Sequence, residues 1–133
     1  MTLLINIDVP DVETGVRFYT TAFDLRVGRR FGTDFVELLG WPAAVYLLAK
    51  KAGTVGAGKD LRRYGRHWTP VHVDVVVEDV DAAVERAVRA GAGLEAPPRE
   101  TPYGRIGMLA DPFGHGFCLL QFNQQGYDAL LAA

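Results

Sequence analysis

Two stretches of the chain repeat one pattern of residues, and this repeat constrains the fold more than any other feature. The first is LINIDVPDVETGVRF, which begins at Leu4, and the second is HVDVVVEDVDAAVERAV, which begins at His72. When Leu4 is set against His72, the hydrophobic residues, the acidic residues and their spacing all agree. We therefore predict two copies of one structural unit, with a chance likeness between two strand–helix units as the alternative.

Each copy opens with a strand whose two faces differ, because β-branched residues alternate along it with other residue types. One face is entirely aliphatic. The other carries Asn6 and Asp8 in the first copy and His72 and Asp74 in the second. Burying an unpaired carboxylate costs several kcal/mol, so this second face must be open to water, line a hydrated cavity or meet a polar ligand.

A helix follows the first strand in each copy. Hydrophobic residues recur at helical spacing over residues 12–23 and 80–91. Asp11 and Asp79 stand just before these segments, where a carboxylate accepts hydrogen bonds from the free N–H groups of a first helical turn. Gly91 is placed to end the second helix.

Three short strand-like segments follow each helix, so each half reads β-α-β-β-β. They are LRVGRRFG, TDFVELLG and AAVYLLAK in the first half, and GLEAPPRE, GRIGMLA and GFCLLQF in the second. We predict one domain, 1–133, of the α+β fold class, with a first module at 3–52 and a second at 69–122. Residues 53–68 lack periodicity and form the linker, and residues 123–133 form a C-terminal tail with a turn or two of helix.

The composition is that of a soluble globular protein, with 49% hydrophobic and 23% charged residues. A formal net charge of −2 gives no overall attraction to nucleic acid or to an anionic membrane. No stretch reaches the roughly 18 apolar residues of a spanning helix. Cys118 is the only cysteine, which excludes an intrachain disulfide and suits a reducing compartment. We expect a cytoplasmic protein with no nucleic-acid or membrane partner.

The modules resemble the vicinal oxygen chelate superfamily, which includes glyoxalase I, extradiol dioxygenases, fosfomycin-resistance enzymes and bleomycin-resistance proteins. The resemblance is carried by the two βαβββ units, by FYTTAFDLRV in the first half and by LADPFGHGFCLLQF in the second. It extends from about Leu4 to Phe122. It implies that the sheets form a cupped, half-open barrel and that the protein is a homodimer.

The resemblance also implies where a metal would bind. Its metal-dependent members take ligands from the first and last strands of each module, and the matching positions here are Leu4, Tyr46, His72 and Cys118. Leu4 cannot coordinate a metal, and Tyr46 is a phenol with an ordinary pKa of about 10. An apolar strand keeps a thiol such as Cys118 protonated. We expect no cofactor, and the alternative is a divalent metal held by His72 and Cys118, with Asp74 on the same face.

A small organic molecule bound in the cup is the expected partner. The candidate ligand-binding residues are Asn6, Asp8, Tyr46, His72, Asp74, Cys118, Tyr103 and Arg105. No catalytic residue is assigned. One alternative is a lyase, isomerase or dioxygenase in which a divalent ion polarises vicinal oxygens. Another is a protein whose repeat serves dimerisation only.

Some of these residues also have ordinary structural interpretations. His72 is either an acid–base or ligand-contacting residue or a hydrogen-bonded, partly buried histidine. Asp74 either orients a ligand or is simply solvated. Cys118 is a small hydrophobe in a strand, or a nucleophile if His72 acts as its base. Glu37 is flanked by apolar residues, and alternation alone does not decide which face of its strand it occupies.

Overall fold

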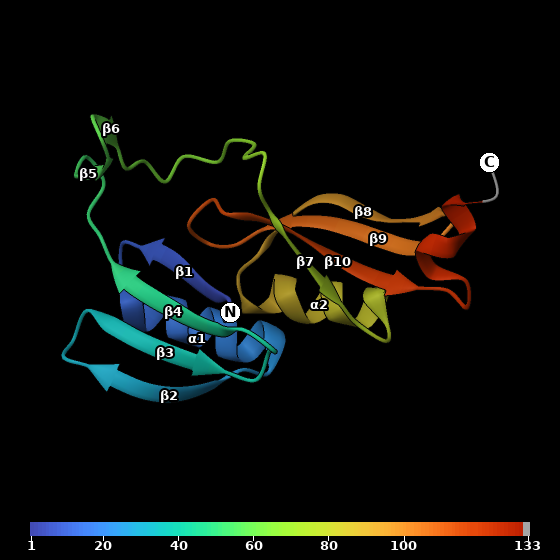
Figure 1. The fold of residues 1–133 in the computed structure, drawn as a ribbon, viewed down its shortest axis with the longest axis horizontal. Helices are drawn as coiled ribbons and strands as arrows, with labels where there is room; N and C mark the ends of the chain where they lie inside the picture. Colours follow the sequence, from blue (N-terminus) through green and yellow to red (C-terminus); the bar gives the residue numbers. More distant parts are fainter. Residues whose placement is uncertain (132–133) are drawn as a thin grey trace. The chain divides into compact units, whose positions relative to one another are not determined.

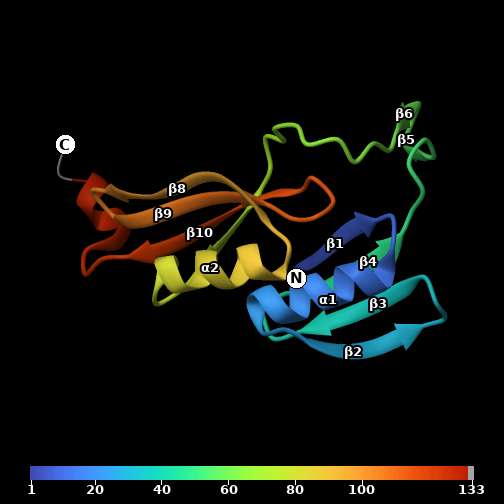
Figure 2. The same ribbon diagram turned by 180° about the vertical axis from the view of Figure 1, so that it is seen from behind.

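The computed structural model describes residues 1–131 of the 133-residue chain. The chain divides into two compact units, the first from Met1 to Gly65 and the second from Arg66 onward. Each unit contains one βαβββ module, and Figures 1 and 2 show the first in blue to green and the second in yellow-green to red. The predicted α+β fold class, with its two βαβββ units, is confirmed.

The first module is a four-stranded sheet with a helix on one face. β1 (Leu4–Val9) pairs in parallel with β4 (Ala44–Ala49), and β3 (Phe35–Leu39) and β2 (Arg26–Phe31) continue the sheet in antiparallel fashion, giving the order β1-β4-β3-β2. α1 (Val12–Phe23) lies behind this sheet in Figure 1 and in front of it in Figure 2. The large side chains that are fully buried here are Val9, Phe18, Val36, Leu38, Val45 and Leu47.

The second module repeats this plan. β7 (Val73–Val76) pairs in parallel with β10 (Gly116–Phe122), and β9 (Gly104–Ala110) and β8 (Gly93–Thr101) follow in antiparallel fashion, giving the order β7-β10-β9-β8. α2 (Val80–Ala90) packs against this sheet. The large side chains that are fully buried here are Val80, Leu109, Leu119 and Leu120.

The segments outside the modules are short. The predicted linker, 53–68, contains a small antiparallel ribbon of β5 (Val55–Ala57) and β6 (Asp60–Leu61). The tail contains η1 (Gly126–Leu130), a 3-10 helix where a helical turn was expected. Residues 132–133 of the tail lie outside the described part of the chain.

Strand pairing shows which residues of the two modules are equivalent. In the first sheet Asn6 of β1 lies opposite Tyr46 of β4, and in the second Asp74 of β7 lies opposite Cys118 of β10. Tyr46 and Cys118 therefore occupy matching positions, as the resemblance implied.

The predicted helix ends are confirmed. Asp11 accepts a hydrogen bond from Thr14 N at 3.1 Å, and Asp79 accepts one from Ala82 N, also at 3.1 Å. Gly91 ends α2 with a φ of 122°, in the region that favours glycine. No helix formed by residues 1–131 has the length and apolar character needed to span a membrane.

Replacing Asp79 by alanine tests the α2 cap. We expect the variant to lose about 1 kcal/mol of unfolding free energy, because an N–H of the first turn loses its acceptor. Urea denaturation measures the loss. Asp79→Asn is the matched control, since its side-chain oxygen still accepts the bond, and an equal loss in both variants would rule out the capping explanation.

Candidate functional site

Three side chains with metal-ligating or acid–base groups meet on the second sheet, on the face opposite α2. His72 directly precedes β7, Asp74 lies in β7, and Cys118 lies opposite Asp74 in β10. His72 Nδ1 is 3.0 Å from Asp74 Oδ1. One ligand atom from each of the three residues lies within 4.8 Å of the other two. The structure thus brings together three of the predicted residues, which we call the His72 cluster.

The Cys118 thiol is protonated at neutral pH. Burial is the main cause that raises its pKa from the ordinary 9.0 to about 11, and the nearby charge of Asp74 and a hydrogen bond to it act in the same direction. Because the thiolate is the form that attacks electrophiles and binds metals, this environment makes Cys118 a weak nucleophile and a reluctant ligand.

The pKa of Cys118 gives a prediction for alkaline pH. Because the folded pKa lies above the ordinary value, the protonated thiol contributes stability below pH 9.0, and this contribution is lost as the pH rises through about 11. We expect Asp74→Asn to lower the pKa, though not below 9.0, because burial remains. The ultraviolet absorbance of the thiolate, followed against pH, measures it. An unchanged pKa in Asp74→Asn would show that the carboxylate does not act on the thiol.

Further side chains surround the His72 cluster. The Trp68 ring lies 5.1 Å from the His72 ring, centroid to centroid. Arg66 binds the Glu95 carboxylate through two nitrogens, at 2.5 and 2.8 Å. Gly116 provides the space for this pair, since a Cβ there would lie 2.5 Å from an Arg66 nitrogen. The sequence alone did not single out Glu95 or Gly116.

A second cluster lies on the first sheet, on the face opposite α1. Glu37 of β3 is only 6% exposed, and it accepts hydrogen bonds from Arg29 Nε at 3.1 Å, from Arg29 Nη2 at 2.7 Å and from Tyr46 Oη at 2.9 Å. The bonds from Arg29 are the main reason that the pKa of Glu37 falls to about 2. We call Arg29, Glu37 and Tyr46 the Arg29 cluster.

A β-bulge aims the backbone and side chain of Arg29 at Glu37. The pairing of β2 with β3 shifts register between Val27 and Arg30. The Arg29 backbone N–H also donates to Glu37 Oε1, at 3.1 Å. A Cβ at Gly28 would lie 2.6 Å from that oxygen, so a side chain there would displace the carboxylate from its present position. Strand alternation left the face of Glu37 open for a different reason, because apolar residues flank it on both sides within β3.

The remaining first-module candidates lie on the same face as Tyr46. Asn6 is exposed opposite Tyr46, and Leu4 is half-exposed two residues before it. Asp8 Oδ2 accepts a hydrogen bond from Arg62 Nε at 2.7 Å. Arg62 therefore connects the predicted linker to the polar face of β1.

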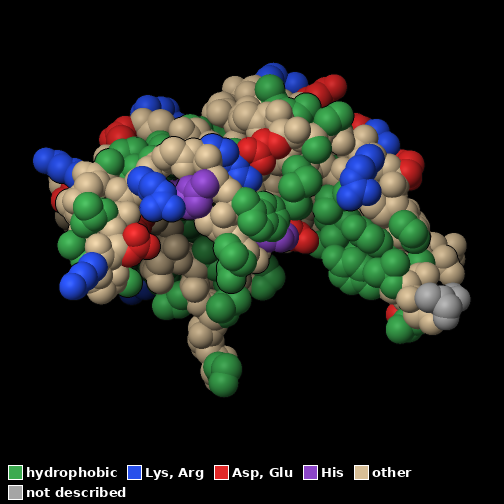
Figure 3. Space-filling view, turned by 90° about the horizontal axis from the view of Figure 1, so that it is seen from above, with side chains coloured by type: hydrophobic (Ala, Val, Ile, Leu, Met, Phe, Trp, Pro, Cys, Tyr) green, Lys and Arg blue, Asp and Glu red, His purple; other side chains and the backbone are tan. Residues whose placement is uncertain are grey.

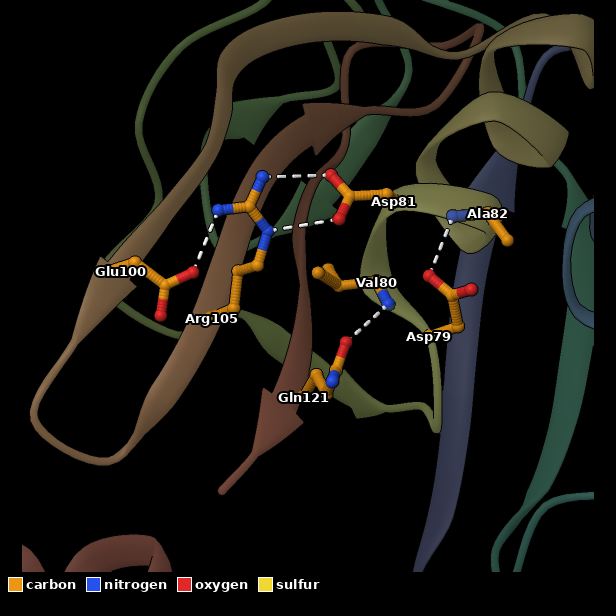
Figure 4. Close-up of polar contacts among 7 residues, drawn as sticks. All are labelled: Asp79, Val80, Asp81, Ala82, Glu100, Arg105 and Gln121. Atoms are coloured by element: carbon orange, nitrogen blue, oxygen red, sulfur yellow. Dashed lines mark hydrogen bonds and ion pairs between the residues drawn. The ribbon is translucent and has the colours of Figure 1, made fainter.

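The structure separates Arg105 and Tyr103 from the other candidates. Arg105 lies on the α2 side of the second sheet, where its guanidinium binds Asp81 at 3.0 Å and Glu100 at 2.9 Å (Figure 4). Tyr103 packs against Tyr127 of η1, with 5.1 Å between ring centroids. Within residues 1–131, no hydrogen bond, ion pair or ring contact joins either residue to the His72 cluster.

Apolar side chains remain exposed beside both clusters. Space-filling Figure 3 shows hydrophobic surface interrupted by acidic, basic and histidine side chains. Phe31 is exposed at the end of β2, next to the Arg29 cluster, and Trp68 and Val76 are exposed near the His72 cluster. Such mixtures of apolar surface and a few polar groups are typical of small-molecule sites.

Residues 4–120 match the family model described as a glyoxalase-like domain. The chain belongs to this family. A relative of the glyoxalase-like chain, an uncharacterized protein of Mycobacterium bovis, is 33% identical over 118 residues, which are 85% of this chain and 78% of the relative. Another, the anthracycline biosynthesis protein DauV of a Streptomyces species, is 34% identical over 118 residues, which are 86% of this chain but only 38% of DauV.

Solved structures share the fold of this chain. The fosfomycin resistance protein FosX of Listeria monocytogenes has a TM-score of 0.72 at 17% identity, with 94% of this chain and 95% of FosX covered. A FosX mutant solved with Mn(II) and 1S,2S-dihydroxypropylphosphonic acid has a TM-score of 0.68 at 18% identity, with 92% and 90% covered. At these identities the likeness establishes the fold alone.

The donor groups of the glyoxalase-like chain do not fit the metal site that the superfamily resemblance implies. Leu4 offers no ligand atom, and the Tyr46 hydroxyl is engaged by Glu37. Glu37 itself is held by Arg29. Of the four implied positions, His72 and Cys118 are left, and with Asp74 they form the His72 cluster, a set of three donors within one module. Its imidazole, carboxylate and sulfur are donor types that zinc accepts.

Proposed function

We propose that this glyoxalase-like chain is a metal-independent binding protein that holds a small organic molecule against the open faces of its sheets. The observation that carries the proposal is the Arg29 cluster, in which the hydroxyl of Tyr46, one of the four implied ligand positions, donates to a Glu37 carboxylate that Arg29 also holds. The residues proposed to contact the ligand are Asn6, Asp8, Tyr46, His72, Asp74 and Cys118.

His72 supplies a directed hydrogen-bonding group in this proposal. A carboxylate accepts hydrogen bonds, so the pairing with Asp74 favours the His72 tautomer whose proton is on Nδ1. In neutral imidazole the other ring nitrogen, Nε2, then carries a lone pair. Nε2 can therefore accept a hydrogen bond from a hydroxyl group of the ligand.

The relatives suggest which molecules to try first. DauV takes its name from anthracycline biosynthesis, and one FosX structure contains a hydroxylated phosphonic acid. Small aromatic natural products and small hydroxylated acids are accordingly the two compound classes with which to begin.

A thermal-shift screen in the presence of EDTA tests the proposal. A ligand at 100 times its dissociation constant stabilises the folded state by about 2.7 kcal/mol, which raises the melting temperature measurably. We expect at least one compound class to do so without metal, and His72→Ala to remove or reduce the shift. If compounds stabilise the chain only when a divalent metal is added, metal-independent binding is wrong.

We also propose that the two modules form one cytoplasmic domain, with 53–68 as the linker. We expect two copies of the chain to form a homodimer. Light scattering on the purified chain checks the oligomeric state. We expect twice the mass of the chain, and the mass of a single chain at micromolar concentration would contradict the dimer.

A metal-dependent enzyme is the second candidate, and the His72 cluster is the observation that favours it. The close approach of His72, Asp74 and Cys118 would let them hold a divalent ion, and such an ion would supply Lewis-acid polarisation of a bound oxygen. The raised pKa of Cys118 opposes binding at neutral pH.

Titration with Co(II) separates the two candidates without an activity assay. A metal held by the cluster would give thiolate-to-cobalt absorbance that disappears in Cys118→Ser. The metal-independent proposal predicts that the wild-type chain gives no such absorbance at neutral pH. A saturable signal at one ion per chain would favour the enzyme.

A further inference from the structure

The guanidinium of Arg29 is fixed along one edge and exposed along the other. Nε and Nη2 share the edge that binds Glu37. The Nη1 N–H groups lie on the opposite edge of the planar group. The Arg29 side chain remains 66% exposed although its partner Glu37 is buried. An arginine held in this way presents ordered hydrogen-bond donors to whatever approaches the face of the sheet.

A row of aromatic rings lies beside this guanidinium. The ring centroids of Phe31 and Phe35 are 4.9 Å apart, and those of Phe35 and Tyr46 are 5.4 Å apart. The Arg29 guanidinium carbon lies 5.1 Å from the Phe31 centroid. These residues come from the adjacent strands β2, β3 and β4 of the first sheet (Figure 1). Together they offer flat apolar surface next to one oriented set of donors.

We infer that the Arg29 cluster, with Phe31 and Phe35, is a subsite for a planar aromatic molecule that carries a neutral oxygen acceptor such as a ring carbonyl. The inference rests on the proposed function and names the class of ligand. The rings contact the aromatic plane, and Arg29 donates to the oxygen.

The charge of the cluster selects a neutral acceptor over an anion. Arg29 and Glu37 form a pair with no net charge, and the pKa of Glu37 near 2 keeps its carboxylate ionised at all physiological pH values. A ligand carboxylate at Arg29 would stand close to Glu37 and gain little net attraction. A carbonyl oxygen accepts from Arg29 without that repulsion.

Glu37 is a positioning residue in this subsite. It does not contact the ligand but fixes Arg29 through three hydrogen bonds, two from the side chain and one from the backbone N–H. Gly28 gives the carboxylate its space. These contacts hold the donors of an exposed arginine in one place, which lowers the entropy cost of binding.

Coumarin and coumarin-3-carboxylate are the probes, because they share one planar ring system and differ by an anionic group. We expect coumarin to shift the amide NMR signals of Arg29, Phe31, Phe35 and Tyr46 in the full chain. Arg29→Gln should weaken coumarin binding by about tenfold, the usual effect of losing one hydrogen bond to a charged group. Coumarin-3-carboxylate should bind the wild type less tightly than coumarin.

Two further variants keep the test decisive. Arg29→Gln/Glu37→Gln removes both charges together, so no buried carboxylate is left unpaired, and it should show the same loss of affinity if Arg29→Gln folds poorly. Arg30→Gln is the matched control, since Arg30 lies on the same strand but pairs with Glu13 of α1 on the other side of the sheet. It should leave coumarin binding unchanged.

The outcomes separate this inference from the proposed function. Coumarin binding that shifts only the His72 cluster and survives Arg29→Gln would overturn the subsite and leave the binding protein intact. An absence of coumarin binding would also overturn the subsite, while the thermal-shift screen judges the proposed function independently. Equal affinity for both probes would overturn the selection of a neutral acceptor.

Discussion

Replacing Gly104 by alanine should destabilise the second module by about 3 kcal/mol or more, the sum of backbone strain and overpacking. Gly104 begins β9 with a φ of 149°, a conformation that residues with a side chain rarely adopt. An added Cβ would also overlap the backbone oxygen of Gln121 in β10. Urea denaturation followed by circular dichroism measures the change.

The expected damage from Gly104→Ala extends to the start of α2. The Gln121 side chain accepts a hydrogen bond from Val80 N at 2.9 Å, as Figure 4 shows, so a displaced β10 also disturbs the helix end. Gly93→Ala is the matched control, because Gly93 begins the neighbouring strand β8 with free space around its Cβ position. A loss of stability in Gly93→Ala equal to that in Gly104→Ala would contradict this explanation.

Replacing Leu109 by alanine should cost about 3 kcal/mol of unfolding free energy. Leu109 of β9 is 0% exposed and pairs with Phe117, the residue just before Cys118 in β10. Truncation removes buried methyl groups and leaves a cavity that a close-packed core fills only in part. Because Phe117 and Cys118 share a strand, the same cavity should also broaden the NMR signals of the His72 cluster.

Leu94→Ala is the control for Leu109→Ala. Leu94 lies opposite Leu109 in β8 but is 45% exposed, so the same chemical change removes far less buried area. We expect a loss below about 1 kcal/mol. Similar losses at the two positions would show that the core does not lie where the structure places it.

The repeated pattern was enough to predict both modules from the sequence. Hydrophobic residues recur at different spacings in strands and helices, so the two kinds of element can be told apart in the sequence. Each unit contains a strand with one aliphatic face, followed by a helix with an acidic cap. Asp11 and Asp79 both accept the expected hydrogen bonds. The alternation in β7 also placed His72 and Asp74 on one face, and the structure brings Cys118 to them through the pairing of β7 with β10.

The Arg29 cluster was not predictable in the same way, because it depends on a break in alternation. The bulge at Gly28 and Arg29 changes which side chains of β2 meet β3, and only the register of the folded sheet reveals it. Arg105 illustrates a different limit. Arg105 and the buried Leu109 are four residues apart in β9, so alternation places them on the same face of the sheet. The partners of Arg105, Asp81 and Glu100, come from other elements, and sequence spacing does not identify them.

Elemental analysis of the chain, purified without chelators or added metal, shows whether the protein holds a metal of its own. Because Leu4 has no donor atom, the Tyr46 hydroxyl is engaged by Glu37 and the Cys118 thiol is protonated, we expect far less than one equivalent of any divalent metal per chain. A full equivalent that copurifies with the wild type and is lost in His72→Ala would contradict it.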